Sequence, residues 1–172
     1  MLIEPDQGSA IQGLKLPGDL YWVLRSPAPL AGMTLPHGSW PWSAIHAAGF
    51  SHVVSLHPYS GDPAPLSFIF KRHLEDLFHG GPPKRPEHEV ALITDSVDKA
   101  LTSVRSGQGV VVHCWGGRGR TGTVLGCILR ELGHDGEATV DYLSRVHQAR
   151  GKDGWPESPW QADLVRSWKR NA

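Results

Sequence analysis

The sequence predicts one α/β domain with a mainly parallel central sheet of four to five strands flanked by helices. Apolar runs of strand length alternate along the chain with segments of helical periodicity, which is typical of a parallel sheet covered on both faces. Glycine or proline ends most of these segments. A chain of 172 residues can bury roughly 70% of its unfolded surface around one core. In such folds, ligands bind beyond the carboxyl ends of the strands.

The first part of the chain predicts a lead-in followed by a strand. Residues 1–19 are polar and contain glycine, so we expect a partly ordered lead-in before a domain at residues 20–172. The apolar run at residues 21–24 predicts the first strand. We expect residues 31–38 to form a loop.

A short helix and two strands are expected next. Residues 40–48 indicate a short helix that Gly49 ends, and the apolar residues 52–56 are typical of a buried strand. Residues 66–71 predict a further strand. The polar loop at residues 76–84 is rich in glycine and proline, which suits either a mobile flap or an ordinary surface loop.

A long helix is expected next, followed by the strand that leads into residues 113–122, the central loop. Pro86 starts a segment with apolar residues at helical spacing, and Gly107 ends it. Residues 109–113 predict a strand. An apolar helical stripe begins at Thr123 and ends at Gly133.

Two more helices complete the predicted domain. Asp135 can cap the first, whose apolar residues continue to Val146. Residues 158–161 have the pattern of a capping box with Pro159 at the first helical position, and Trp168 faces inward from the last helix.

The composition argues against several classes of protein. The 17 Lys and Arg balance the 17 Asp and Glu, so no overall field favours a nucleic acid as partner. The two cysteines, Cys114 and Cys127, do not suggest a disulfide framework, and we expect Cys127 to be a buried thiol within a helix. The ten histidines show no metal-ligand spacing, so we expect no metal and no cofactor.

The sequence also predicts the environment of the protein. Residues 1–6 do not resemble a secretory signal, and no apolar run approaches the roughly 18 residues that would span a bilayer. We expect a cytoplasmic monomer without membrane insertion.

The most informative stretch is HCWGGRGRTG at residues 113–122, between a predicted strand and a predicted helix. A strand, a glycine-rich turn and a helix N-terminus aim backbone N–H groups and a helix dipole at one point, which makes an anion site. The same positive field favours the thiolate of Cys114. Arg120 can offer a planar fork to two phosphate oxygens. We therefore predict thiolate attack on phosphorus, giving a phosphocysteine that water hydrolyses.

This stretch resembles the H-C-x5-R-[ST]-G signature of the cysteine-dependent protein tyrosine phosphatases, and its compactness is similar to the dual-specificity branch, including bacterial members. The resemblance implies a phosphatase fold over about residues 20–170. It implies that Cys114 is the nucleophile and Arg120 the phosphate clamp. It further implies that Thr121 assists the leaving thiolate and that His113 orients the loop. The backbone cradle that it implies for the substrate consists of Trp115, Gly116, Gly117, Arg118 and Gly119.

The same mechanism needs a general acid on a loop upstream of the nucleophile. Asp76, followed by glycines and prolines, resembles the family's acid loop, and Asp62 in another Gly/Pro-rich loop is the alternative. Gln161 lies where related enzymes often place a glutamine that positions the hydrolytic water, although a capping box requires the same residue. Residues 155–157 imitate a tryptophan-proline-acid motif, and we expect them only to lead into the last helix.

These observations predict a metal-independent hydrolase of a phosphorylated protein or a small phosphomonoester. Phosphotyrosine proteins are the first choice of substrate, and phosphoserine and phosphothreonine proteins are further candidates. Arg118 beside Arg120, with Lys84 and Arg85 after the acid loop, keeps a phosphoinositide or an inositol phosphate as an alternative. A catalytically silent phosphate-binding module usually lacks the nucleophile or the arginine. A redox enzyme built on the two cysteines would give Arg120 no role.

Overall fold

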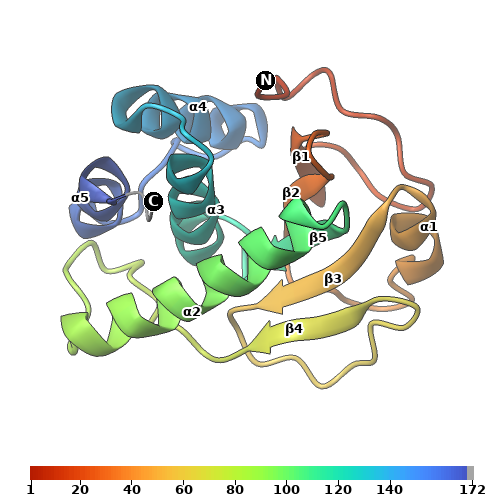
Figure 1. Cartoon of the computed structure of the whole chain (residues 1–172), viewed down its shortest axis with the longest axis horizontal. Coiled ribbons are helices and arrows are strands. Elements are labelled where there is room, and N and C mark those ends of the chain that lie inside the picture. The colour runs from red at the N-terminus through yellow and green to blue at the C-terminus, as the bar shows by residue number, and fades with distance from the viewer. Residues whose placement is uncertain (170–172) are drawn as a thin grey trace.

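Five strands form one sheet in the computed structural model, which describes residues 1–169, so the end of the predicted domain at residues 20–172 lies outside the described part. The strands are β1 (Leu20–Leu24), β2 (Leu30–Met33), β3 (Phe50–Ser55), β4 (Ser67–Lys71) and β5 (Gly109–His113). Their order is β1-β2-β5-β3-β4 (Figure 1). β1 and β2 are antiparallel, and the other neighbours are parallel. The predicted mainly parallel sheet is confirmed.

Strand β2 corrects the prediction of a loop at residues 31–38. Its sequence, LAGM, has none of the β-branched or aromatic residues that signal a strand. All four residues are nevertheless buried, because β1 and β5 pair with β2 on its two sides. The Tyr21 ring lies directly against Gly32 and leaves no room for a side chain there. Close packing therefore selects small residues at a position where strand propensity would select large ones.

Helices cover both faces of the sheet. They are α1 (Trp42–Ala47), α2 (Pro86–Arg105), α3 (Gly119–Glu131), α4 (Gly136–Ala149) and α5 (Pro159–Ser167). Figure 1 shows α2 to α5 together on one side of the sheet and α1 on the other. The predicted cap of α4 is present, since the Asp135 carboxylate accepts from Ala138 N–H at 3.0 Å. Helix α3 begins at Gly119, earlier than the predicted Thr123, because the central loop turns directly into its first turn.

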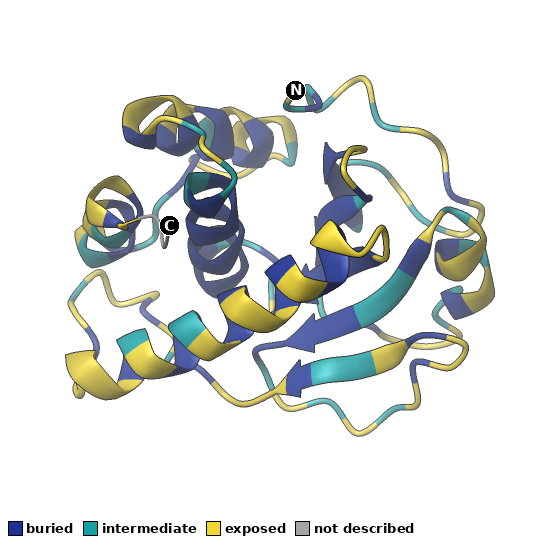
Figure 2. Cartoon of the chain, viewed as in Figure 1, coloured by how far each residue is buried: buried dark blue, intermediate teal, exposed yellow. Residues whose placement is uncertain are grey.

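Each face of the sheet carries its own apolar core. Along β5, Val110 and Val112 belong to the core under α2 to α5, whereas Val111 belongs to the core under α1. Figure 2 shows α3 buried along almost its whole length, as expected for the central helix of the larger core. Ile3 and Ile11 of the lead-in join the smaller core. The lead-in thus contributes to the smaller core and also contacts α4, because the Tyr142 hydroxyl donates to the Ile3 carbonyl at 2.6 Å.

The parallel strands bring four loops to one edge of the sheet. Thr34 follows β2, His57 follows β3, Asp76 lies on the loop after β4, and Cys114 directly follows β5. Because β1 is antiparallel, it begins at this same edge, next to the end of the lead-in. The carboxyl edge of the sheet therefore gathers chemically active side chains from segments far apart in the sequence.

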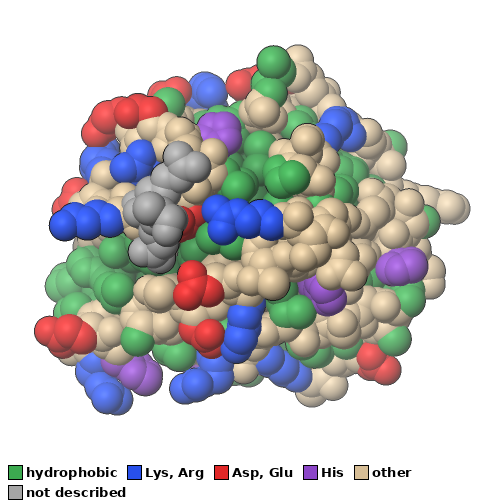
Figure 3. Space-filling view, in the orientation of Figure 1, with side chains coloured by type: hydrophobic (Ala, Val, Ile, Leu, Met, Phe, Trp, Pro, Cys, Tyr) green, Lys and Arg blue, Asp and Glu red, His purple; other side chains and the backbone are tan. Residues whose placement is uncertain are grey.

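Charged side chains of both signs are interspersed on the face shown in Figure 3. Several form exposed ion pairs, such as Lys99 with Asp95 and Arg166 with Glu137. Within residues 1–169, no helix combines the length and the apolar character that crossing a membrane requires. Because positive and negative side chains are mixed over this surface, a site for an anion has to be built from groups that lie close together.

Candidate active site

The stretch at residues 113–122 forms a tight loop between β5 and α3. β5 is buried throughout, and Cys114, directly after it, is only 2% exposed. Gly117 has a φ of +71°, in the left-handed region that favours glycine. A Cβ at this position would lie 2.5 Å from the Met33 carbonyl oxygen. Only glycine therefore lets the loop curl against the end of β2.

Donors outside the loop bind its carbonyl groups from two directions. The Thr34 hydroxyl and the Leu35 N–H donate to the Trp115 carbonyl at 3.1 and 2.9 Å. The Trp155 indole N–H donates to the Gly119 carbonyl at 3.3 Å. These bonds turn the two carbonyl oxygens away from the centre of the loop.

Arg150 and Tyr21 bind the middle of the loop in the same way. The Tyr21 hydroxyl donates to the Gly117 carbonyl at 2.6 Å, and Arg150 Nη2 donates to the Gly116 carbonyl at 2.9 Å. The same guanidinium donates to the Gly18 carbonyl at 2.7 Å. Sequence reasoning missed Arg150, because nothing in its local sequence distinguishes it from an ordinary arginine at the end of a helix.

The outward carbonyls determine where the loop's N–H groups point. In a planar trans peptide, the C=O of one residue and the N–H of the next point in opposite directions. Since the carbonyls of residues 115–117 bind groups outside the loop, the N–H groups of residues 116–118 face its inside. The N-terminus of α3 adds its positive dipole at the same point. This arrangement of N–H groups can bind an anion beside Cys114.

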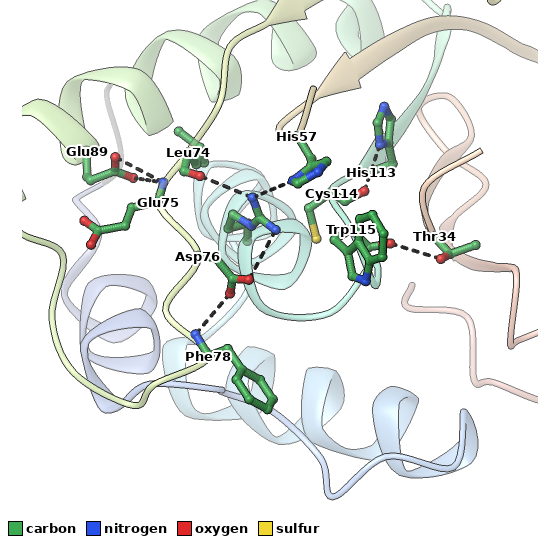
Figure 4. Close-up of polar contacts among 11 residues, drawn as sticks. Thr34, His57, Leu74, Glu75, Asp76, Phe78, Glu89, His113, Cys114 and Trp115 are labelled. Carbon is green, nitrogen blue, oxygen red and sulfur yellow. Dashed lines mark hydrogen bonds and ion pairs between the residues drawn. The ribbon is translucent and has the colours of Figure 1, made fainter. Parts of the chain in front are cut away.

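Arg120, in the first turn of α3, has partners on the loops after β3 and β4. Its Nη1 donates to the Leu74 carbonyl at 3.2 Å and lies 3.2 Å from His57 Nδ1. Its Nη2 lies 3.8 Å from Asp76 Oδ2, and its side chain is 6% exposed. Figure 4 labels these three partners, His57, Leu74 and Asp76, and Arg120 lines the same cavity as Cys114.

The loop that carries Asp76 is fixed by hydrogen bonds at both of its ends. Asp76 Oδ1 accepts from Phe78 N–H at 3.0 Å, and the Asp76 side chain is half exposed. Glu75 N–H donates to both carboxylate oxygens of Glu89 on α2, at 3.2 and 3.3 Å. Burial raises the pKa of the Glu89 carboxyl group. Asp76 thus lies on an anchored loop with its carboxylate facing Arg120.

His113 and Thr121 are buried behind the loop. His113 Nδ1 lies 3.0 Å from the Cys114 carbonyl oxygen, which can only accept, so Nδ1 carries the proton. Burial lowers the pKa of His113 to about 4, and the imidazole is therefore neutral at pH 7. Within the described part of the chain, Thr121 Oγ1 is buried without a hydrogen-bond partner.

Two predicted binding residues have structural partners of their own. Arg118 Nε donates to the Gly154 carbonyl at 2.7 Å. Gln161 Oε1 accepts from the backbone N–H groups of residues 157 and 158, so the predicted capping box is present. A Cβ on Gly119 would lie 3.1 Å from Gln161 Nε2, which places the amide next to the loop. Its role in positioning water stays a prediction.

A cavity of about 170 Å³ opens over the loop. The predicted residues that line it are Asp76, Cys114, Trp115, Gly116, Arg118 and Arg120. Figure 4 shows the Cys114 sulfur between the side chains of Asp76 and Trp115. The alternative acid, Asp62, instead accepts from Ala64 N–H at 2.9 Å within its own turn.

Three residues that sequence reasoning did not select also line the cavity: Phe78, Lys152 and Glu157. The expectation that residues 155–157 only lead into the last helix was wrong, because the Glu157 carboxylate lies against Gly119. Lys152, after α4, and Glu157, before α5, reach the cavity through the packing of these helices on α3, whereas Phe78 lies on the loop that carries Asp76. No local pattern in the sequence carries that information.

A known protein family matches most of the chain. Residues 20–155 match the model of the family described as Swiss Army Knife protein, DSP-PTPase phosphatase domain. The chain belongs to this family. The match runs from the start of β1 to the segment after α4, and so includes the central loop, Asp76 and the partners of Arg120.

Solved structures share the fold of this DSP-PTPase domain. Tk-PTP in its active form is 23% identical, with a TM-score of 0.58, and the match covers 81% of this chain and 90% of that one. TpbA of P. aeruginosa, in complex with pTyr, is 17% identical, with a TM-score of 0.59 and coverage of 90% and 92%. The catalytic core of the PP-IP phosphatase SIW14 of S. cerevisiae is 14% identical, with a TM-score of 0.58 and coverage of 81% and 80%.

Replacing Arg150 by lysine should loosen the central loop. Lysine keeps the charge but cannot reach the carbonyls of Gly18 and Gly116 together, so we expect about tenfold weaker binding of orthophosphate. Hydrogen exchange of the amides at residues 115–118 should also be faster. Isothermal titration calorimetry and exchange mass spectrometry measure these effects.

The matched control is Arg145→Lys on the same helix, where exposed ion pairs to Asp141 and Glu4 contribute little. Its phosphate affinity and exchange rates should equal those of the wild type. Unchanged exchange in Arg150→Lys would show that the loop keeps its shape without this guanidinium.

Proposed function

We propose that this domain hydrolyses phosphotyrosine in proteins through a phosphocysteine intermediate, without a metal ion. The observation that carries the proposal is the position of Cys114 at the base of an anion site, with Arg120 beside it and Asp76 in the same cavity. Nucleophile, phosphate clamp and acid thus face one ligand from three different elements.

In the first step, the Cys114 thiolate attacks phosphorus, and the bond between phosphorus and the leaving oxygen breaks. The N–H groups of residues 116–118 and the Arg120 guanidinium stabilise the charge on the equatorial oxygens. Asp76 donates its proton to the leaving oxygen, which departs as an alcohol or a phenol. His113 is neutral and hydrogen-bonded to the Cys114 carbonyl, so it orients the loop and does not act as the base.

In the second step, water attacks the phosphocysteine. The Asp76 carboxylate accepts a proton from the water, the bond between phosphorus and sulfur breaks, and inorganic phosphate leaves. The Thr121 hydroxyl, buried and without another partner among the described residues, is available to the departing thiolate. We propose that Gln161, whose amide lies next to Gly119, helps to position the water.

The rim of the cavity supports an aromatic phosphate ester as substrate. Among the described residues, Phe78 and Trp115 are two of the most exposed large apolar side chains, at 77% and 63%, and both line this cavity. A phenyl ring between them would bury apolar surface that is otherwise in water. Arg118 and Lys152 favour the second candidate, a phosphoinositide or an inositol phosphate, because they add positive charge to the same cavity.

A substrate panel separates these two candidates. We expect a higher kcat/KM for phosphotyrosyl peptides than for phosphoseryl peptides or inositol phosphates, because only the tyrosyl ring contacts both Phe78 and Trp115. The rate of hydrolysis of each substrate is measured from the inorganic phosphate that is released. An inositol phosphate with the highest kcat/KM would favour the second candidate.

Replacing Cys114 by serine should lower kcat for p-nitrophenyl phosphate at least about 1,000-fold, because a serine hydroxyl is a far weaker nucleophile at neutral pH. The assay contains EDTA, so that metal-dependent hydrolysis does not contribute. Cys127→Ala is the control, since this thiol is buried in α3 and takes no part in the proposed steps. Activity that survives Cys114→Ser would exclude the cysteine mechanism.

Replacing Asp76 by asparagine should slow a substrate with a basic leaving group more than one with an acidic leaving group. We expect about 100-fold or more for a phosphotyrosyl peptide, and less for p-nitrophenyl phosphate, whose leaving phenolate needs little protonation. Asp62→Asn is the matched control and should have no effect. Equal losses on both substrates would argue against Asp76 as the acid.

A further inference from the structure

His57 lies directly after β3 and contacts the clamp of the active site, although it carries no signal in the sequence. Its Nδ1 is 3.2 Å from Arg120 Nη1. The imidazole also makes an edge contact with the Trp115 ring at a centroid distance of 5.4 Å (Figure 4). A second edge contact joins it to the His73 ring at 5.3 Å. Its own carbonyl accepts from the Ser55 hydroxyl at 3.1 Å.

The contact with Arg120 determines which nitrogen of His57 carries the proton. A guanidinium has five N–H donors and no acceptor, so His57 Nδ1 must accept and the ring must be neutral, with its proton on Nε2. The two hydrogens on Arg120 Nη1 then go to His57 and to the Leu74 carbonyl. Nε–H and Nη2 form the remaining edge of the fork, which can bind two phosphate oxygens.

We propose that His57 is a positioning residue that, in its neutral form, orients Arg120 for the phosphate in the transition state. This inference rests on the proposed phosphatase function, because it assigns a partner to the clamp of that mechanism. His57 acts through Arg120 and does not touch the reacting atoms. A neutral acceptor orients the guanidinium without cancelling the positive charge that the phosphate needs.

The groups around His57 favour this neutral form. Burial and the Arg120 guanidinium on α3 lower the pKa of His57, and His73 after β4 lowers it further. Asp76 on the acid loop acts in the opposite direction. His113 at the end of β5 is also close enough to interact with His57, and it is neutral at pH 7. Protonation of His57 would remove the acceptor and place an N–H and a positive charge against Nη1.

Two substitutions at His57 separate positioning from simple packing. His57→Ala should lower kcat for p-nitrophenyl phosphate about ten- to 100-fold, with a smaller change in KM, because the lost contact orients a group that acts most strongly in the transition state. His57→Asn should recover most of kcat, since the amide Oδ1 takes the place of Nδ1 and accepts the same hydrogen bond. His73→Asn, next to the same ring but without a contact to Arg120, should leave both constants unchanged.

The pH profile tests the protonation state directly. The ratio of kcat/KM for the wild type to that for His57→Asn isolates the effect of His57, because the two enzymes differ only at this residue. We expect this ratio to be constant above pH 6.5, the ordinary pKa of histidine, and to fall at lower pH as His57 becomes protonated. His73→Asn should move this fall to slightly higher pH, because it removes a group that lowers the pKa of His57, and should leave the plateau above it unchanged.

The outcomes distinguish this inference from the proposed function. Wild-type kcat in His57→Ala, or a ratio that does not change with pH, would overturn the positioning role while Cys114-dependent activity remained. Activity in Cys114→Ser would overturn the phosphatase mechanism itself. Circular dichroism and thermal unfolding show whether His57→Ala is folded. If His57→Ala does not fold, the pH dependence of the kcat/KM ratio between the wild type and His57→Asn still tests the proposal.

Discussion

The site depends on one constraint: the carbonyl groups of the central loop must point outward so that its N–H groups point inward. A loop with four glycines among residues 113–122 has no strong conformational preference of its own, and the rest of the fold has to impose one. Tyr21 comes from β1, Thr34 follows β2, and Arg150 lies at the end of α4, yet all three donate to loop carbonyls. The sheet and the C-terminal helices thus meet to hold one short segment.

Arg120 and Arg150, two of the arginines at the central loop, are each held by a neutral histidine. Arg120 Nη1 lies 3.2 Å from His57 Nδ1, and Arg150 Nη1 lies 3.1 Å from His147 Nδ1. Burial and the Arg150 guanidinium lower the pKa of His147 to about 2, so it is a permanent acceptor at neutral pH. A carboxylate in the same place would also orient an arginine, but its charge would oppose an incoming phosphate. An uncharged acceptor leaves the positive field intact.

The sequence predicts the parts of this protein that depend on local pattern. The alternation of strands and helices, and the spacing from Cys114 to Arg120, need no knowledge of distant residues. Strand β2 escaped prediction because small residues pack against Tyr21 there, and they carry no strand signal. His57, Arg150 and Glu157 escaped it because each reaches the loop only after remote elements have packed together. A sequence pattern therefore predicts the proposed nucleophile and clamp, whereas the residues that support them are properties of the tertiary structure.

The difference between the two arginines follows from the hydrogen bonds that each has left to make. All N–H groups of Arg150 have acceptors, among them the carbonyls of residues 17 and 18 in the lead-in and of residues 116 and 117 in the loop. It can therefore support the loop but has no donor to offer a substrate. Arg120 uses its Nη1 for support and keeps the edge formed by Nε and Nη2. The same side chain thus supports the loop at one position and is the proposed phosphate clamp at the other, according to how many donors the fold leaves available.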